Sequence, residues 1–240
     1  MEKAIERMRN HYIICGVGHN GENAVNHLVA SDHPFVMIDR LEERCLAYQV
    51  NPNGRIPYLV ADATEDATLR RAGIERAVGL IAALPSDQDN IMLVLSARQL
   101  NPLLRIVSKV SEASARNKLR KVGADGVVSP SEMGGLRLFS ELVRPGVMTF
   151  LDDLIQTTDQ NLRIDELPIP EGSPLDGCQL AASDIRRRTN LLVVGVRQPD
   201  DGAFIYNPGP EFVVKSHMAM IVLGPIDAIE KLKTMIKKRV

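Results

Sequence analysis

Three glycines near the amino terminus have the spacing of a turn that can hold phosphate groups. The stretch HYIICGVGHNGE, which begins at His11, contains the pattern G-x-G-x-x-G at Gly16, Gly18 and Gly21, directly after a short apolar run. The first glycine permits a tight turn, the second lets backbone N–H groups approach a pyrophosphate, and the third allows a helix to pack on a strand. The start of that helix carries partial positive charge, which favours phosphate. The stretch predicts a nucleotide-binding turn.

A carboxylate follows at the place where the ribose of such a nucleotide is held. The second apolar run, Phe35–Ile38, ends in Asp39, 18 residues after Gly21. An acid there accepts hydrogen bonds from ribose hydroxyls and disfavours a 2′-phosphate. NAD, ATP, ADP or AMP is therefore preferred over NADP, although the neighbouring Arg40 weakens this preference.

Two further polar residues have roles that the sequence leaves open. Asp62 lies in the run VADAT, which follows the third expected strand at the adenine end of such pockets. It can bind a base edge or cap the next helix. His19 lies inside the glycine turn, and we interpret it as a phosphate contact or a solvent-facing residue rather than a base.

No set of residues for a reaction accompanies this pocket. The five histidines are scattered, and G-x-S-x-G and H-E-x-x-H motifs are absent from the sequence. The adjacent acids Asp152 and Asp153 are interpreted as solvated. The sequence therefore predicts binding rather than catalysis, with a nicotinamide-dependent oxidoreductase as an alternative that its residues support less well.

Composition indicates an ordinary globular protein of a reducing compartment. The 240 residues are 45% hydrophobic and 25% charged, and the net charge of −1 gives no reason to expect a nucleic-acid partner. Cys15, Cys45 and Cys178 stand far apart without a C-x-x-C pair, which argues against disulfides and zinc. Apolar runs stay far below the ~20 residues of a membrane helix, and the charged first ten residues do not resemble a signal peptide.

From residue 11 onwards, short apolar runs alternate with helical patterns. Runs of Val, Ile and Leu without polar alternation indicate strands buried on both faces, as in a parallel sheet. We expect strands at Tyr12–Cys15, Phe35–Ile38, Tyr58–Ala61, Ala77–Ala83, Leu104–Val110 and Gly126–Ser129. We expect helices at Gly21–Ala30, Glu42–Val50, Ala67–Ala72, Asp87–Leu100 and Ser111–Val122. The fold class is α/β, a Rossmann-like doubly wound parallel sheet of about six strands.

The chain divides into four expected parts. Residues 1–10 form a helical lead-in rather than core, 11–130 the Rossmann-like lobe, 131–157 a helical crossover, and 158–240 a small α+β lobe. We favour a subunit interface for the crossover over simple cover of the first lobe, because its apolar residues are expected to be exposed. These residues are Leu136, Phe139, Leu142, Phe150 and Leu154.

The last part has the pattern of a half-exposed sheet closed by a helix. A helix is expected from Ile226 to about Lys238, with basic residues in its last turns. The expected strands are Leu162–Ile169, Leu191–Val196, Ala203–Tyr206, Val213–Val214 and Met218–Leu223.

The glycine turn and several motifs after it resemble those of a known family, the RCK/KTN (TrkA-N) regulatory domain followed by a TrkA-C domain. The resemblance extends over nearly the whole chain and is specific in its combination of D-A-T, A-G-I, A-R-x-L-N-P and G-A-D-x-V-x-P. It rests on HYIICGVGHNGE, VADATEDATLRRAGIERAVGLIAAL, DQDNIMLVLSARQLNP, KLRKVGADGVVSPSEMGG and LPIPEGSPLDG.

The resemblance assigns roles to individual residues. It implies a phosphate loop, a ribose acid with its neighbouring arginine, a base-side loop, and a crossover at 134–150 that joins two subunits. The residues concerned are Gly16, Val17, Gly18, His19, Asn20 and Gly21 in the phosphate loop, Asp39 and Arg40 at the ribose, and Asp62, Ala63 and Thr64 in the base-side loop.

The resemblance also implies a function. Family members dimerise through the crossover and form octameric rings, in which a ligand such as NAD or ADP/ATP alters ring geometry and pulls on the helices of a membrane pore. The leading stretch MEKAIERMRNHYIICG resembles the linker after a pore helix in prokaryotic potassium channels. We therefore expect the gating-ring part of such a channel, at the cytoplasmic face of the membrane. The alternative is a soluble regulatory subunit of a Trk/Ktr potassium transporter.

Calcium is a weaker expectation. A calcium-gated member of the family has carboxylates just after the fourth strand and along the fifth. The corresponding stretches here, Ala82–Leu84 and Val107–Glu112, contain one acid, Glu112, and Lys109 would repel a cation. The comparison disfavours calcium at that place and leaves a divalent-cation site elsewhere open.

Overall fold

The chain folds into two compact units, Met1–Phe139 and Ser140–Val240. The computed structural model describes residues 2–48, 55–156, 162–200 and 202–237. Each unit has its own sheet and its own core.

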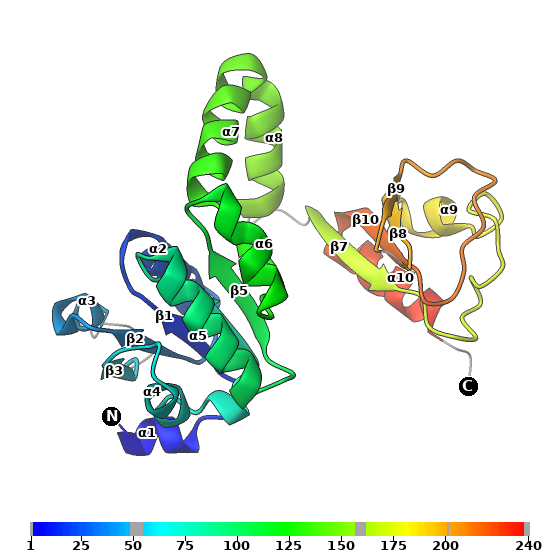
Figure 1. The fold of residues 1–240 in the computed structure, drawn as a ribbon. Helices are drawn as coiled ribbons and strands as arrows, with labels where there is room; N and C mark the ends of the chain where they lie inside the picture. The colour runs from blue at the N-terminus through cyan, green and yellow to red at the C-terminus, as the bar shows by residue number, and fades with distance from the viewer. Residues whose placement is uncertain (1, 49–54, 157–161, 201, 238–240) are drawn as a thin grey trace. The chain divides into compact units, whose positions relative to one another are not determined.

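The first unit is built on a six-stranded parallel sheet (Figure 1). Its strand order, β3-β2-β1-β4-β5-β6, places β1 in the middle, paired in register with β2 and β4. This is the order of a doubly wound nucleotide-binding sheet, which confirms the expected fold class. The strands are β1 (Tyr12–Cys15), β2 (Phe35–Asp39), β3 (Tyr58–Val60), β4 (Gly79–Ala82), β5 (Arg105–Lys109) and β6 (Gly126–Val128).

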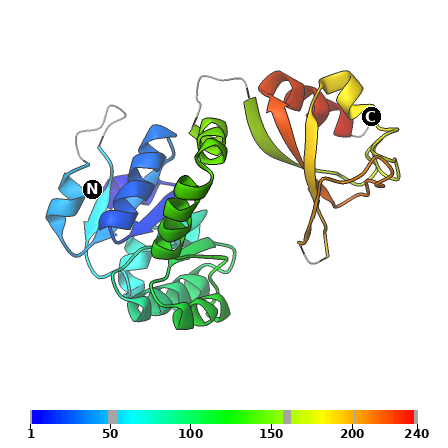
Figure 2. The ribbon, with the colours of Figure 1, turned by 90° about the horizontal axis from the view of Figure 1, so that it is seen from above.

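Helices cover both faces of this sheet (Figure 2). α2 and α3 lie on one face, and α5 and α6 on the other. The helices are α2 (His19–Ala30), α3 (Glu42–Leu46), α4 (Asp66–Arg71), the 3₁₀-helix η1 (Ile74–Arg76), α5 (Asp87–Leu100) and α6 (Ala113–Lys121). The expected helix Glu42–Val50 ends at Leu46, and its last two expected residues, 49 and 50, lie outside the described residues.

Alternate residues of each central strand enter different cores, because successive side chains of a strand point to opposite faces. Ile13 and Cys15 of β1 pack with Leu93 and Val94 of α5, whereas Ile14 packs with Val25 of α2. Both sides of β1 are therefore buried, which explains why the strand has no polar alternation.

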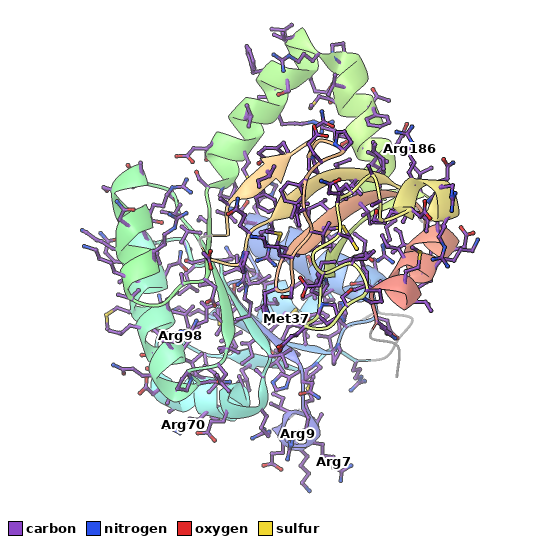
Figure 3. All side chains as sticks on the ribbon, turned by 90° about the vertical axis from the view of Figure 1, so that its right-hand side faces the viewer. Arg7, Arg9, Met37, Arg70, Arg98 and Arg186 are labelled. Carbon is purple, nitrogen blue, oxygen red and sulfur yellow. The ribbon has the colours of Figure 1, made fainter. Side chains whose placement is uncertain are left out.

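The leading segment is part of the first core, contrary to the expectation of a lead-in outside it. In α1 (Glu2–Arg7), Ile5 is completely buried in the cluster around β1 and β4. Arg76 of η1 donates hydrogen bonds to the carbonyl oxygens of Met8, at 3.3 Å, and Ile5, at 3.4 Å. Figure 3 shows Arg7 and Arg9 of this segment projecting outward. Because its partners lie some 70 residues away in the sequence, local pattern could not reveal this packing.

The crossover forms two consecutive helices, α7 (Pro130–Val143) and α8 (Pro145–Gln156). Pro145 is the first residue of α8, a position that suits proline because it needs no N–H partner there. No residue of α7 is buried, and its large apolar side chains are exposed. Leu154 is partly buried, unlike the other four predicted apolar residues, on a helix that contacts β7. Residue 157, where the predicted crossover ends, lies outside the described residues.

The second unit has a four-stranded antiparallel sheet in the order β7-β10-β8-β9. Its core contains Leu167, Val196 and Val222 from the sheet and Leu232 from the last helix. The elements are β7 (Leu162–Pro168), α9 (Ile185–Thr189), β8 (Leu192–Arg197), β9 (Phe204–Tyr206), β10 (Ala219–Pro225) and α10 (Ile226–Ile236).

Two details of this unit differ from the sequence prediction. The predicted strand Val213–Val214 is a single bridge between Val213 and Gln179, and α9 was not predicted. Lys238, the last expected residue of the closing helix, lies outside the described residues. Within the described part of the chain, no helix is long and apolar enough to cross a membrane.

Candidate nucleotide-binding site

The glycine turn connects β1 to α2, and two of its glycines have no room for a side chain. Gly16 has a φ of +89°, and a Cβ placed on it would lie 2.8 Å from the carbonyl oxygen of Ala83. A Cβ on Gly21 would lie 1.9 Å from the carbonyl oxygen of Gly16. These two glycines therefore allow the tight turn and the close helix–strand contact that the pattern predicted.

Gly18 differs from the other two glycines. It is the N-cap of α2, with a φ of −80°, and a Cβ there would have Arg44 Nη1 as its nearest neighbour at 3.6 Å. Sterically, the fold tolerates a side chain at Gly18. The first N–H groups of α2, at His19 and Asn20, have no intrahelical acceptor, as at any helix start. They are suited to bind an anion.

Asp39 is bonded to the turn itself. Its Oδ2 accepts a hydrogen bond from the N–H of Val17 at 2.7 Å, and its Oδ1 accepts one from the N–H of Leu41 at 2.9 Å. The residue is 6% exposed, and Arg44 Nη1 lies 3.6 Å from Oδ2. The acid at the end of β2 thus holds the backbone of the glycine turn in place.

Asp62 organises the loop after β3 and does not cap the next helix. Its Oδ1 accepts hydrogen bonds from the N–H and the hydroxyl of Thr64, at 2.9 and 2.8 Å, whereas the N-cap of α4 is Glu65. Its Oδ2 lies 2.5 Å from Arg40 Nη2. The bond from the Thr64 N–H and the Arg40 charge lower the pKa of Asp62, and the same pairing raises the pKa of Arg40.

A cavity of about 300 Å³ lies at the carboxyl ends of the strands, where a doubly wound sheet holds its ligand. It brings together five of the predicted site residues, Gly16, Asp39, Arg40, Asp62 and Ala63, while the other six do not line it. Its remaining lining residues, which we did not predict, are Ile38, Leu41, Arg44, Ala61, Leu84, Pro85 and Asp89.

Arg44 is a cationic lining residue of the cavity that we did not predict. It lies on α3, and its guanidinium is near both Asp39 and Gly18. The signal in the sequence is an arginine five residues after Asp39 in a stretch with a helical pattern. The direction of the Arg44 side chain depends on where α3 packs, which the sequence does not show.

A buried amide supports the loop after β4. Asn90 is fully buried and exchanges two hydrogen bonds with the backbone of Leu84, one from the N–H of Leu84 at 3.0 Å and one to its oxygen at 3.1 Å. Lys109 Nζ also reaches the oxygen of Leu84, at 3.3 Å. The wall of the cavity at Leu84 is therefore fixed from two other elements, α5 and β5.

Two buried cysteines of the first unit, Cys15 and Cys45, are held as thiols. Burial raises the pKa of the Cys45 thiol to about 11 and raises that of Cys15 further, so both are protonated near neutral pH. Among the residues that the structure describes, no three or more His, Cys, Asp or Glu gather as metal ligands.

The strand order and the glycine turn define a Rossmann-like domain followed by a small α+β domain. Residues 12–130 match the TrkA-N domain family, and residues 165–237 match the TrkA-C domain family. The chain is 35% identical over its full length to "Probable potassium channel protein 2" of Methanocaldococcus jannaschii, and it covers 70% of that protein. The chain belongs to the family of RCK regulatory domains built from TrkA-N and TrkA-C.

Two further similarities bear on the kind of protein. The "Trk system potassium uptake protein TrkA homolog" of Methanothermobacter thermautotrophicus is 24% identical over 91% of this chain and 95% of that protein. The solved GsuK channel is 25% identical, with a TM-score of 0.50, over 98% of this chain and 41% of that one. The chain thus spans less than half of the GsuK chain and nearly all of a TrkA homolog.

Proposed function

We propose that this chain is the regulatory domain of a potassium channel and binds an adenine nucleotide, NAD or ADP/ATP, at the glycine turn. The observation that supports this most directly is the turn itself. Gly16 and Gly21 are packed too closely for any side chain, while Gly18, at the helix start, is open. The 35% identity to a potassium channel protein supports the channel over other RCK contexts.

In this proposal each part of the site binds one part of the nucleotide. The N–H groups of Gly18, His19 and Asn20 hold phosphate, Asp39 receives the ribose hydroxyls, and the Asp62 loop with Ala63 and Thr64 flanks the base. The carboxyl group of Asp39 is already oriented by Val17 and Leu41.

The role is regulatory rather than catalytic. Bound nucleotide changes gating only by its difference in affinity between two states of the assembly. A divalent cation is the second class of regulatory ligand in this proposal.

Assembly is proposed to occur through the crossover. The large apolar residues of α7 and of α8 are exposed, and a second copy would bury them; they include Leu136, Phe139, Leu142 and Phe150. Dimers formed in this way are proposed to build an octameric ring at the cytoplasmic face of the membrane, connected to a pore through the segment 1–10. The four-part division at residues 10, 130 and 157 belongs to this proposal.

The alternative is a nucleotide-binding regulatory subunit of a Trk/Ktr transporter, which the match to nearly all of a TrkA homolog favours. The gene sequence upstream of Met1 separates the two. Two membrane helices with a T-V-G-Y-G-like filter mean a channel, and a separate reading frame without a pore means a transporter subunit.

Isothermal titration calorimetry of the chain with NAD, NADH, ATP and ADP tests the pocket. We expect saturable binding of at least one of them, weakened by about 10-fold or more in Gly18→Ala. Absence of binding by all four would refute the nucleotide half of the proposal.

A further inference from the structure

Arg44 occupies a position between the two parts of the pocket that would hold ribose and phosphate. Its Nη1 lies 3.6 Å from Asp39 Oδ2 and 3.6 Å from the place of a Cβ on Gly18. Its side chain is 41% exposed and lines the cavity. The guanidinium therefore lies directly beside the part of the turn that is sterically open.

The second arginine of the cavity is held differently. Arg40 Nη2 lies 2.5 Å from Asp62 Oδ2, a charge-assisted hydrogen bond at the base end. The 3.6 Å separation between Arg44 and Asp39 exceeds hydrogen-bond length. Arg44 therefore makes no hydrogen bond to Asp39, whereas Arg40 already donates one to Asp62.

The turn needs such a cation, because it already contains a buried negative charge. The N–H of Val17 donates to Asp39 Oδ2, so this donor is not available to a phosphate. The ionised carboxyl group of Asp39 would also repel a phosphate placed beside it. A guanidinium next to both groups offsets this repulsion and supplies planar N–H donors that match phosphate oxygens.

We propose that Arg44 is a phosphate-binding residue and that it makes the site selective for adenine nucleotides with a 5′-phosphate chain over adenosine. The inference rests on the proposed nucleotide function and deepens it. Arg44 keeps its long-range attraction to Asp39 while its N–H groups donate to a phosphate oxygen on the α2 N-terminus.

Calorimetry of the full chain with ADP, adenosine and 2′-AMP tests this assignment. A charge-assisted hydrogen bond corresponds to about 10- to 100-fold in affinity, so we expect Arg44→Gln to weaken ADP binding by that factor. Adenosine binding should change by less than about 2-fold, because no phosphate is present to lose its partner. Arg44→Lys should recover part of the ADP affinity, since it retains the charge without the planar donors.

The control is Arg70→Gln, which removes the same charge from an exposed arginine that pairs with Glu75 and does not line the cavity. It should leave ADP affinity unchanged. Circular dichroism confirms that each variant is folded.

Each other outcome is decisive. Unchanged ADP affinity in Arg44→Gln, or an equal loss for ADP and adenosine, overturns the assignment while the nucleotide site stands. If Arg44→Gln weakens the binding of 2′-AMP alone, Arg44 contacts a phosphate on the ribose 2′ position and not the 5′-phosphate chain, which also overturns the assignment. If the unaltered chain binds none of NAD, NADH, ATP and ADP, the proposed function fails, and this inference fails with it. If it binds NAD but neither ADP nor ATP, the nucleotide site stands and the Arg44 assignment for ADP is overturned.

Discussion

Gly18 and Gly21, the second and third glycines of the motif, should differ in what they lose when each is replaced by alanine. A Cβ on Gly21 would lie 1.9 Å from the carbonyl oxygen of Gly16, a backbone atom that cannot turn aside. A Cβ on Gly18 would lie 3.6 Å from the mobile end of Arg44, and the φ of −80° suits any residue. We therefore expect Gly21→Ala to damage the fold and Gly18→Ala to damage binding.

The contact distance sets the size of the effect on the fold. To reach ordinary contact, α2 and the turn must separate by about 1.5 Å in Gly21→Ala. Overpacking costs about 1–3 kcal/mol and occasionally more, so we expect a loss of about 3 kcal/mol. At about 3 °C per kcal/mol for a unit of this size, the melting temperature should fall by about 9 °C.

Gly18→Ala should leave stability within about 1 kcal/mol. Alanine is a poorer N-cap than glycine, but it also reduces the conformational entropy of the unfolded chain, and the two effects are of similar size. Its methyl group would stand where a phosphate approaches the N–H groups of α2. Nucleotide affinity should therefore fall by about 10-fold or more, the factor that 1.4 kcal/mol represents.

Thermal unfolding followed by circular dichroism measures the first effect, and calorimetry with ADP measures the second. Amide exchange of Tyr12–Cys15 assigns any loss of stability to the first unit. The reasoning is refuted if Gly21→Ala melts with the unaltered chain, or if Gly18→Ala binds ADP equally well.

Three further outcomes are expected. Asp39→Ala removes the acceptor of two backbone N–H groups, so chemical denaturation should show a loss of about 2 kcal/mol or more in addition to weaker ADP binding; unchanged stability would contradict the hydrogen bonds described. Asn90→Ala leaves the backbone of Leu84 without its partners, and we expect unfolding free energy to fall by about 2–3 kcal/mol in urea, an effect that an exposed control such as Gln99→Ala should not share. Burial, with Arg76 and Arg9 nearby, lowers the pKa of His11 below its ordinary value of 6.5. The unfolded chain therefore binds more protons than the folded chain in acid. The stability that neutral His11 contributes is fully present above about pH 6.5 and is lost as the pH falls through the folded pKa. His11→Gln should flatten this decline between pH 7.5 and 5.5 in denaturant titrations, and an unchanged slope would exclude His11 as its source.

The sequence was sufficient where the determinants are local. The strand Tyr12–Cys15 and the helix Asp87–Leu100 lie where their patterns predicted. Both elements are determined by residues that are close in the sequence. The strand is a short apolar run, and the helix begins after Ser86, an N-cap whose hydroxyl accepts a hydrogen bond from the N–H of Asp89. The short helix Ile185–Thr189 was missed because IRRRT is one turn long and too short to show a period.

The sequence was insufficient where distant segments meet. The burial of Ile5 depends on η1, and the direction of Arg44 depends on the packing of α3 beside the glycine turn. The role of Asp62 could not be predicted for the same reason. Its sequence suits a loop or a helix cap equally, and only the folded positions of Thr64 and Arg40 show that Asp62 holds the loop.

Asp39 shows what the glycine motif and its acid specify together. Before any ligand is present, this carboxyl group accepts from the N–H of Val17 and fixes the turn. The turn is thus ordered in advance, which lowers the entropy that binding must overcome. A site that is equally ordered in every state of an assembly cannot shift its equilibrium, however tightly it binds. Under the proposed function, the difference between gating states must therefore involve groups with weaker restraints, and Arg44, 3.6 Å from its acid, is such a group.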